Sequence, residues 1–294
     1  MPDELTPLTP TLSQREREAV ERAAQGKTLR LPRVPHRGRV GEVRAASVGS
    51  SMEMHDFRAY QPGDDVRHLD WNAVARTGEL VVRVRQEEVS PRVEVLLDAS
   101  RSMAVSPVKA ERSTEVAMLL CKVAARQGLE PTVLVTSRSP RRATGGGCEA
   151  VLRALEHDAA DHLLEALRRS PPLRPCGLRL VVSDFLFEAP LDQLAQRLSA
   201  QASALALIQV LDQEDTRPTG GEGARLVDAE TGEVLERILA SSVVESYQRR
   251  LAEHQQLLRT AAFRVRATLV TAPAQPSIDV LARGPLAPLW EGDR

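Results

Sequence analysis

The chain has 294 residues, a formal net charge of −1 and only 3% aromatic residues. It therefore lacks the basic surface and the stacking side chains of nucleic-acid-binding proteins, and no nucleic-acid partner is expected. Three dispersed cysteines without a Cys-x-x-Cys pair argue against a disulfide framework or a structural zinc site. Because we find no signal-peptide pattern and no apolar run of membrane-spanning length, we expect a cytoplasmic protein without direct membrane insertion.

The first ninety residues form two small segments ahead of a larger domain. Residues 1–27 contain a capping-box-like start at Ser13 and a short charged helix that ends near Gly26. Residues 28–90 are rich in Pro, Gly and Arg and lack a self-sufficient apolar core. We expect an extended, β-rich segment there, with a strand at residues 80–85, that lies against a larger body.

From residue 91 onward, apolar strands alternate with amphipathic helices. The patterns predict five strands, at residues 93–97, 132–136, 178–182, 205–211 and 263–270, and four helices, at residues 108–126, 163–167, 191–198 and 243–261. A hairpin is predicted inside an insertion at residues 213–240. This alternation predicts an α/β, Rossmann-like domain over residues 91–272, with a mostly parallel sheet covered by helices on both faces. The tail, residues 273–294, is expected to wrap the surface.

A polar motif follows the first strand of this domain directly. Asp98, Ser100 and Ser102 alternate along the chain, so their side chains can converge beyond the carboxyl end of the strand, where open parallel sheets place ligand sites. A carboxylate with two hydroxyls suits Mg²⁺ or Mn²⁺, with water completing an octahedron, and does not suit zinc. The alternative is that either serine only caps the following helix.

Two later residues are further candidates for the same site. Asp184 follows the strand predicted at 178–182 and can supply a second carboxylate, or else a helix cap or a loop ion pair. Thr144 precedes three glycines and can bring a third hydroxyl on a flexible loop, although the glycine run also fits a plain connection.

A second unusual segment runs from residue 60 to residue 71, around a Pro-Gly turn. Its acids and arginines predict a dense ion-pair cluster, which either clamps this segment onto the main domain or forms a partner-binding surface. A second metal site that uses these acids and His68 is a further alternative. The residues concerned are Asp64, Asp65, Arg67, Asp70, Trp71 and Arg76.

Most enzyme classes are unsupported because their motifs are missing. The chain has no P-loop, no Gly-x-Gly-x-x-Gly after the first strand and no Gly-x-Ser-x-Gly elbow. One enzymatic alternative stays open, a metal-dependent hydrolase in which Asp98 and Asp184 hold an ion that activates water. The sequence offers no clear general base beside them, so we expect no enzyme.

The Asp98-x-Ser100-x-Ser102 motif with Asp184 resembles the metal-ion-dependent adhesion site of von Willebrand factor A domains. The chain more specifically resembles the bacterial domain-of-unknown-function family fifty-eight, which joins such a domain to a preceding signature segment. That segment matches Asp56-Phe57-Arg58-x-Tyr60-x-Pro62-Gly63-Asp64-Asp65-x-Arg67-x-x-Asp70-Trp71, and the similarity covers about residues 40–270.

The resemblance implies a Rossmann-like sheet with a metal-dependent edge for docking proteins. Asp98 would hold the ion partly through water, Ser100 and Ser102 would bind it directly, and Asp184 would complete the shell, whereas the loop of Thr144 does not clearly reproduce the family's threonine motif. The resemblance also implies a MoxR-type AAA+ ATPase as partner and a chaperone-like adaptor role in the assembly or activation of client proteins. We therefore expect a non-enzymatic docking module. The alternatives are a metal-free module that binds through the Asp64–Trp71 surface, or the hydrolase.

Overall fold

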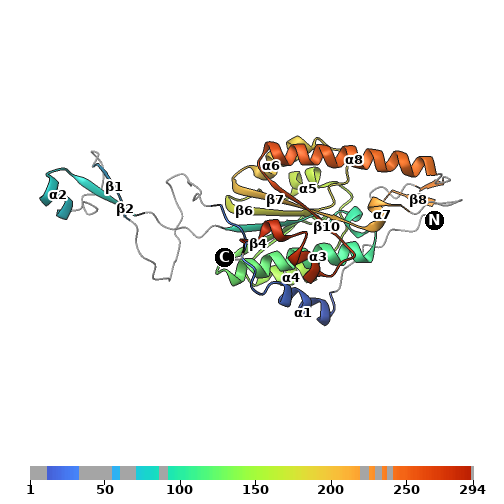
Figure 1. The fold of residues 1–294 in the computed structure, drawn as a ribbon, viewed down its shortest axis with the longest axis horizontal. Coiled ribbons are helices and arrows are strands. Elements are labelled where there is room, and N and C mark those ends of the chain that lie inside the picture. The colour runs from blue at the N-terminus through green and yellow to red at the C-terminus, as the bar shows by residue number, and fades with distance from the viewer. Residues whose placement is uncertain are drawn as a thin grey trace. The chain divides into compact units, whose positions relative to one another are not determined.

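The computed structural model describes residues 12–32, 55–59, 71–85, 92–218, 225–228, 234–236 and 241–292. The chain divides into two compact units, one made of residues 1–36 and 91–294 and the other of residues 37–90. Figure 1 shows the elements of both units. Within the described residues, no helix combines the length and the apolar character that crossing a membrane requires.

The larger unit is built on a six-stranded sheet in the order β10-β7-β6-β3-β4-β5. Five strands are parallel, and β5 is antiparallel to β4. The central strands are apolar runs buried on both faces, as covered parallel sheets require. The strands are β3 (Val93–Leu97), β4 (Pro131–Val135), β5 (Arg141–Thr144), β6 (Cys176–Ser183), β7 (Ala202–Leu211) and β10 (Thr268–Pro273).

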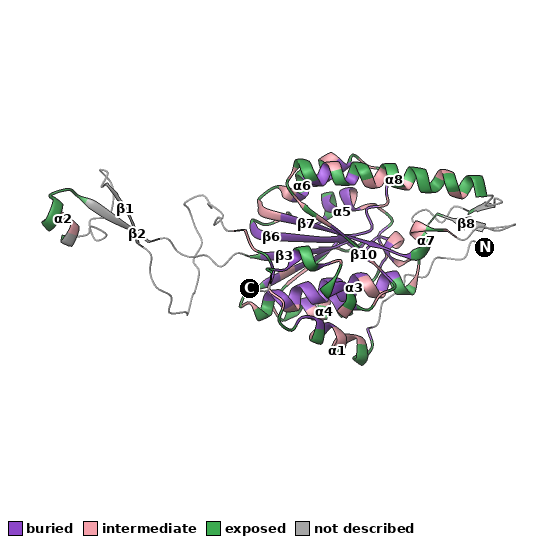
Figure 2. Cartoon of the chain, viewed as in Figure 1, coloured by how far each residue is buried: buried purple, intermediate pink, exposed green. Residues whose placement is uncertain are grey.

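Helices cover both faces of this sheet, so the α/β architecture expected from the sequence is confirmed (Figure 1). One apolar cluster packs α1 (Gln14–Ala23), α3 (Pro107–Arg126), α4 (Gly147–Arg153) and α9 (Ile278–Arg283) against one face. The other cluster packs α5 (Leu163–Arg169), α6 (Leu191–Ser199) and α8 (Ser241–Arg264) against the opposite face. Figure 2 shows the buried strands between these two layers.

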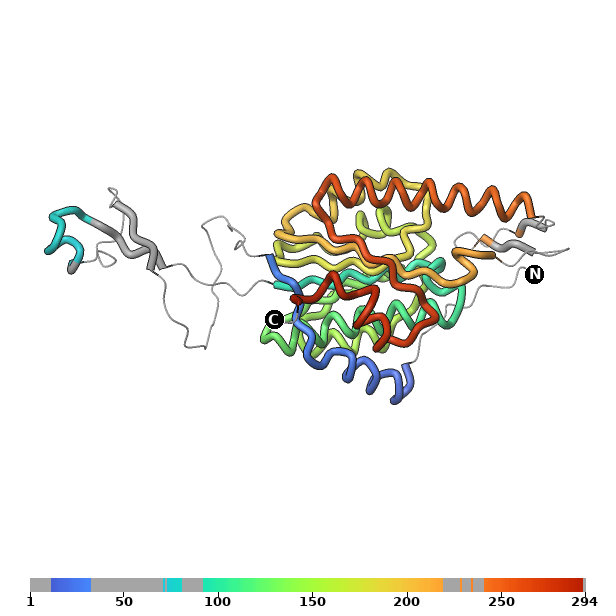
Figure 3. Tube along the Cα trace, viewed as in Figure 1, coloured from blue at the N-terminus to red at the C-terminus, as the bar shows by residue number. Residues whose placement is uncertain are grey.

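The end of the chain departs from the sequence-based expectation. Helix α8 continues to Arg264, and Phe263, predicted to begin a strand, is 83% exposed on that helix. The strand starts later, at Thr268, after a turn in which Arg266 has a φ of 56°. Beyond Pro273 the chain folds back onto this unit through α9 and η3 (Ala287–Leu289) (Figure 3). Ile278, Leu289 and Trp290 belong to the apolar core, and Trp290 is 4% exposed. The tail is thus part of the core and not a surface wrapping.

Two short helices and a hairpin complete the larger unit. The 3-10 helix η2 (Arg101–Ala104) lies between β3 and α3, and α7 (Gln213–Thr216) follows β7. The expected hairpin is present as β8 (Arg225–Val227) paired antiparallel with β9 (Val234–Glu236).

In the smaller unit, β1 (His55–Ala59) pairs antiparallel with β2 (Val81–Arg85), and α2 (Trp71–Thr77) lies between them in the sequence. This pairing confirms the strand that the β-branched run at residues 80–85 predicts.

Candidate functional site

The predicted motif lies at the carboxyl edge of the sheet, where β3 and β6 end side by side. Asp98 follows β3 and still pairs with β6, since its amide donates to the Val182 carbonyl at 2.9 Å. Asp184 directly follows the last residue of β6, Ser183. The structure therefore brings Asp98 and Asp184 to one edge, as the parallel alternation predicts.

Asp98 is a buried carboxylate that hydrogen bonds hold in place. Its Oδ1 accepts the amide of Ser100 at 3.0 Å, and its Oδ2 accepts the hydroxyl of Ser183 at 2.7 Å. Its side chain is completely buried, and within the described part of the chain no basic side chain forms an ion pair with it. Burial and, second, the nearby charge of Asp184 raise the pKa of Asp98 to about 6. Such a carboxylate gains strongly from a cation.

The two motif serines present adjacent oxygens. The Oγ atoms of Ser100 and Ser102 lie 3.0 Å apart, close enough for a hydrogen bond. Two ligand oxygens at right angles around Mg²⁺, each at about 2.1 Å from the ion, also lie about 3.0 Å apart. Asp98 contacts this pair through the Ser100 amide, and each carboxylate oxygen keeps a lone pair for a further ligand. These three residues therefore fit a small octahedral cation completed by water.

Asp184 differs from Asp98, because its carboxylate forms an ion pair with a lysine. Its Oδ2 lies 2.9 Å from the Nζ of Lys109 and its Oδ1 accepts the amide of Leu186 at 3.0 Å. Its carbonyl accepts Nε2 of Gln209 at 3.0 Å. The next residue, Phe185, has a φ of 54°, a left-handed conformation that a bulky side chain rarely adopts and that often marks functional sites.

Sequence reasoning missed Lys109 and Asp215. The Nζ of Lys109 also lies 2.8 Å from Oδ2 of Asp215 in α7, so the ammonium bridges two acids. A signal for Lys109 was present, because it is one of three lysines in an arginine-rich chain and lies in the first turn of α3, where the helix dipole disfavours a cation. The sequence gives no comparable indication for Asp215, because its pattern is typical of a surface acid in a short helix.

Thr144 does not belong to this edge, which corrects the expectation that it approaches the ion. It ends β5 and pairs with Thr132, near the amino end of β4, and the two Oγ1 atoms lie 3.5 Å apart. Because β4 runs parallel to β3, Thr144 lies at the opposite edge of the sheet from Asp98. The sequence pattern predicts a loop here, whereas residues 141–144 form a half-exposed edge strand.

The signature-segment prediction falls largely outside the described residues. Asp64, Asp65, Arg67 and Asp70 are not described, and neither is His68. Trp71 and Arg76 lie on α2, and the Trp71 side chain is 64% exposed.

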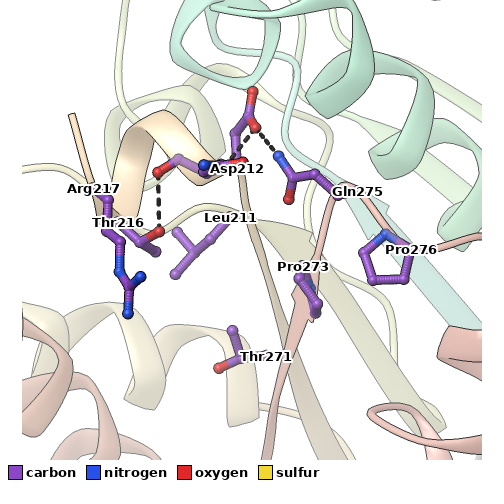
Figure 4. Close-up of a pocket in the computed structure, with 9 residues that line it drawn as sticks. Leu211, Asp212, Thr216, Arg217, Thr271, Pro273, Gln275 and Pro276 are labelled. Carbon is purple, nitrogen blue, oxygen red and sulfur yellow. Dashed lines mark hydrogen bonds between the residues drawn. The ribbon is translucent and has the colours of Figure 1, made fainter. Parts of the chain in front are cut away.

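A pocket of about 540 Å³ opens at the same sheet edge, beside α7 (Figure 4). Asp212, which follows β7, accepts the Gln213 amide at 2.5 Å and hydrogen bonds to Gln275 and Ser106. The pocket combines apolar and charged walls next to the candidate site. Its lining residues are Leu211, Asp212, Gln213, Thr216, Arg217, Thr271, Pro273, Gln275 and Pro276.

A cation at this edge would depend on hydroxyls and water. Among the residues that the structure describes, no group of three or more His, Cys, Asp or Glu side chains is arranged to hold a metal ion. Asp98, Ser100 and Ser102 are therefore the residues that would hold Mg²⁺ or Mn²⁺, while Asp184 is engaged by Lys109.

Comparison with known proteins places the chain in a family. Uncharacterized protein Rv1480 of Mycobacterium tuberculosis and uncharacterized protein Mb1516 of Mycobacterium bovis are each 27% identical to it in an alignment of 225 residues that covers 70% of this chain and 70% of theirs. Similar solved structures include conserved hypothetical protein BatB from Bacteroides thetaiotaomicron (13% identity, 68% of this chain and 98% of that one, TM-score 0.37). The SpRpn10 VWA domain is another (14% identity, 69% and 98%, TM-score 0.35). The model of the family described as protein of unknown function DUF58 matches residues 56–257, and the chain belongs to this family.

Proposed function

We propose that this chain is a non-enzymatic docking module that binds an acidic side chain of a partner protein through a divalent cation. Asp98, Ser100 and Ser102 hold Mg²⁺ or Mn²⁺ at the carboxyl edge of the sheet. The ion leaves coordination positions to water, and a partner's carboxylate replaces one of those waters.

The observation that carries this proposal is the buried carboxylate of Asp98, for which the described part of the chain supplies no basic partner. Burying an ionised acid costs free energy unless a cation compensates it, and among the residues that the structure describes Asp98 receives hydrogen bonds from Ser100 and Ser183 but no ion pair. A neutral side chain of the same shape would avoid that cost and could keep these hydrogen bonds. A bound cation would compensate the charge of Asp98, and the Oγ atoms of Ser100 and Ser102 are spaced to be further ligands of that cation.

The partner that we propose is a MoxR-type AAA+ ATPase, with client proteins assembled or activated by the pair. This choice rests on the resemblance to family fifty-eight. The pocket beside α7 supports docking at this edge, because its walls include the apolar Leu211 and Pro273 and the cationic Arg217, which suit a segment with acidic and apolar side chains.

The proposal is tested by capture of the MoxR-type ATPase from the same organism on the immobilised chain, in 5 mM Mg²⁺ or in excess EDTA, at about physiological ionic strength. We expect capture in Mg²⁺, at least tenfold less in EDTA, and a similar loss for Ser102→Ala in Mg²⁺. Ser199→Ala is the matched control, since this serine lies on α6 and its hydroxyl donates to the Gln196 carbonyl of the same helix. Equal capture of all three proteins in both buffers would contradict metal-dependent docking.

A metal-free docking module is the second candidate, favoured by the ion pair between Lys109 and Asp184. In this version the ammonium already compensates the charge of Asp184, and partners bind elsewhere, for example at the exposed Trp71 of the signature segment. Capture that resists EDTA and Ser102→Ala but is lost in Trp71→Ala would favour this candidate.

A further inference from the structure

Lys109 is the most deeply buried ammonium group at the candidate site. Its side chain is 1% exposed, and its Nζ lies 2.9 Å from Asp184 Oδ2 and 2.8 Å from Asp215 Oδ2. Burial favours the neutral amine, but the charges of the two acids outweigh burial and raise the pKa of Lys109 above its usual value. The side chain is therefore a charged ammonium inside the protein.

The position of Lys109 in its helix makes the charged ammonium unfavourable. It lies in the first turn of α3, where the partial positive charge of the helix end opposes a cation. Its amide donates to Oγ of Ser106, the N-cap residue, at 3.2 Å. Ser106 in turn hydrogen bonds to Asp212, which ties the start of α3 to the start of α7.

The second acid of the pair is fixed as firmly as the first. Oδ2 of Asp215 accepts the Asp212 amide at 2.8 Å, closing a capping box at α7, and the Asp215 carbonyl accepts the Tyr247 hydroxyl of α8 at 2.7 Å. Elements α3, β6, α7 and α8 thus hold the ammonium and its two carboxylates in one geometry. Both carboxylate oxygens of Asp184 are thus engaged, Oδ2 by Lys109 and Oδ1 by the Leu186 amide.

We infer that Lys109 is a resident cation for Asp184 and withholds this carboxylate from a divalent ion bound by Asp98, Ser100 and Ser102. This inference rests on the proposed function and adds a residue that sets the ion affinity of the site. The ammonium removes one carboxylate from the coordination sphere and adds a positive charge next to it. The site therefore binds Mg²⁺ weakly and retains more water positions for a partner's acid.

The test is Mg²⁺ binding to the full chain, measured by isothermal titration calorimetry, in wild type and in Lys109→Met/Asp215→Asn. The double variant keeps the net charge of the three-residue cluster at −1, since one cation and one anion are removed together, but leaves Asp184 free. We expect it to bind Mg²⁺ about 10- to 100-fold more tightly, the range over which changes to groups around the metal ligands typically alter metal affinity. Lys109→Arg keeps the cation and should retain wild-type affinity.

A second variant addresses Asp184 without removing the lysine. Asp184→Asn should leave Mg²⁺ affinity within about threefold of wild type, because this carboxylate is not a ligand while Lys109 is present. A loss of more than tenfold would overturn the inference, and so would equal affinities of the wild type and the double variant. In both cases the metal site itself would stand. Absence of Mg²⁺ binding from every protein would overturn the inference and the proposed function together.

Discussion

Replacing Asp98 by asparagine should stabilise the metal-free protein while abolishing its response to Mg²⁺. The pKa of Asp98 is raised from 3.8 to about 6, mainly by burial, and this shift corresponds to a cost of about 3 kcal/mol for the ionised form. The folded protein holds this proton to higher pH than the unfolded chain does. The cost is therefore absent below about pH 4, grows up to about pH 6 and is complete at neutral pH.

Asparagine removes the charge and keeps the local contacts. Its Oδ1 can still accept the Ser100 amide, and its amide group can donate to the Ser183 hydroxyl, which now donates to Asp98. In urea unfolding at pH 7.5 with EDTA, Asp98→Asn should raise the free energy of unfolding by about 2–3 kcal/mol. Asp192→Asn is the control, since Asp192 is a surface acid paired with Arg264, and its effect should stay below about 1 kcal/mol.

Adding Mg²⁺ should close this gap in stability between the wild type and Asp98→Asn. At one hundred times its dissociation constant, the ion stabilises the wild type by about 2.7 kcal/mol and leaves Asp98→Asn unchanged. If Asp98→Asn were instead the less stable protein in EDTA, its carboxylate would serve the fold as a hydrogen-bond acceptor, and the reasoning from its buried charge would be refuted.

Two further predictions concern buried charges away from the site. Burial, opposed by Arg112, raises the pKa of Glu115 to about 7, so the free energy of unfolding should fall as pH rises from about 4.5 to 7. Glu115→Gln should remove this pH dependence and add about 2 kcal/mol to the free energy of unfolding at pH 8. An unchanged pH dependence in unfolding experiments would contradict the assignment to Glu115. Arg179 is fully buried, with Nε 2.7 Å from Oε2 of Glu94, so Arg179→Met should cost about 3–5 kcal/mol by leaving that acid poorly compensated. Glu94→Gln in the same chain should restore part of the loss, and a single-variant cost below about 1 kcal/mol would show that the pair is dispensable.

The elements that the sequence predicts well are those whose apolar pattern decides their burial. Residues 93–97 form β3 as expected, and the helix expected at 108–126 differs from α3 by one residue at its start. The missed strand β5 is polar and half-exposed, and pairing with β4 supports it without an apolar pattern of its own. At the end of α8, Phe263 is exposed and continues the helix. Aromatic residues are common in strands, so the residue type at this position led to a wrong strand prediction.

The candidate site divides in the same way. The alternation of Asp98, Ser100 and Ser102 and the position of Asp184 after a strand follow from sequence spacing, and the structure brings them to one edge. Thr144 was misplaced because a strand in the opposite direction carries it to the far edge. The bridge from Lys109 to Asp215 depends on how α3 and α7 meet, a contact over more than one hundred residues that no local pattern encodes.

The most direct test of a cation at the sheet edge is a crystal structure of the chain grown with Mn²⁺, with the ion located by its anomalous scattering. The account predicts one Mn²⁺ in contact with the Oγ atoms of Ser100 and Ser102 and beside the carboxylate of Asp98, while Asp184 stays paired with Lys109. An anomalous map without a peak at this position, in crystals grown at millimolar Mn²⁺, would contradict it.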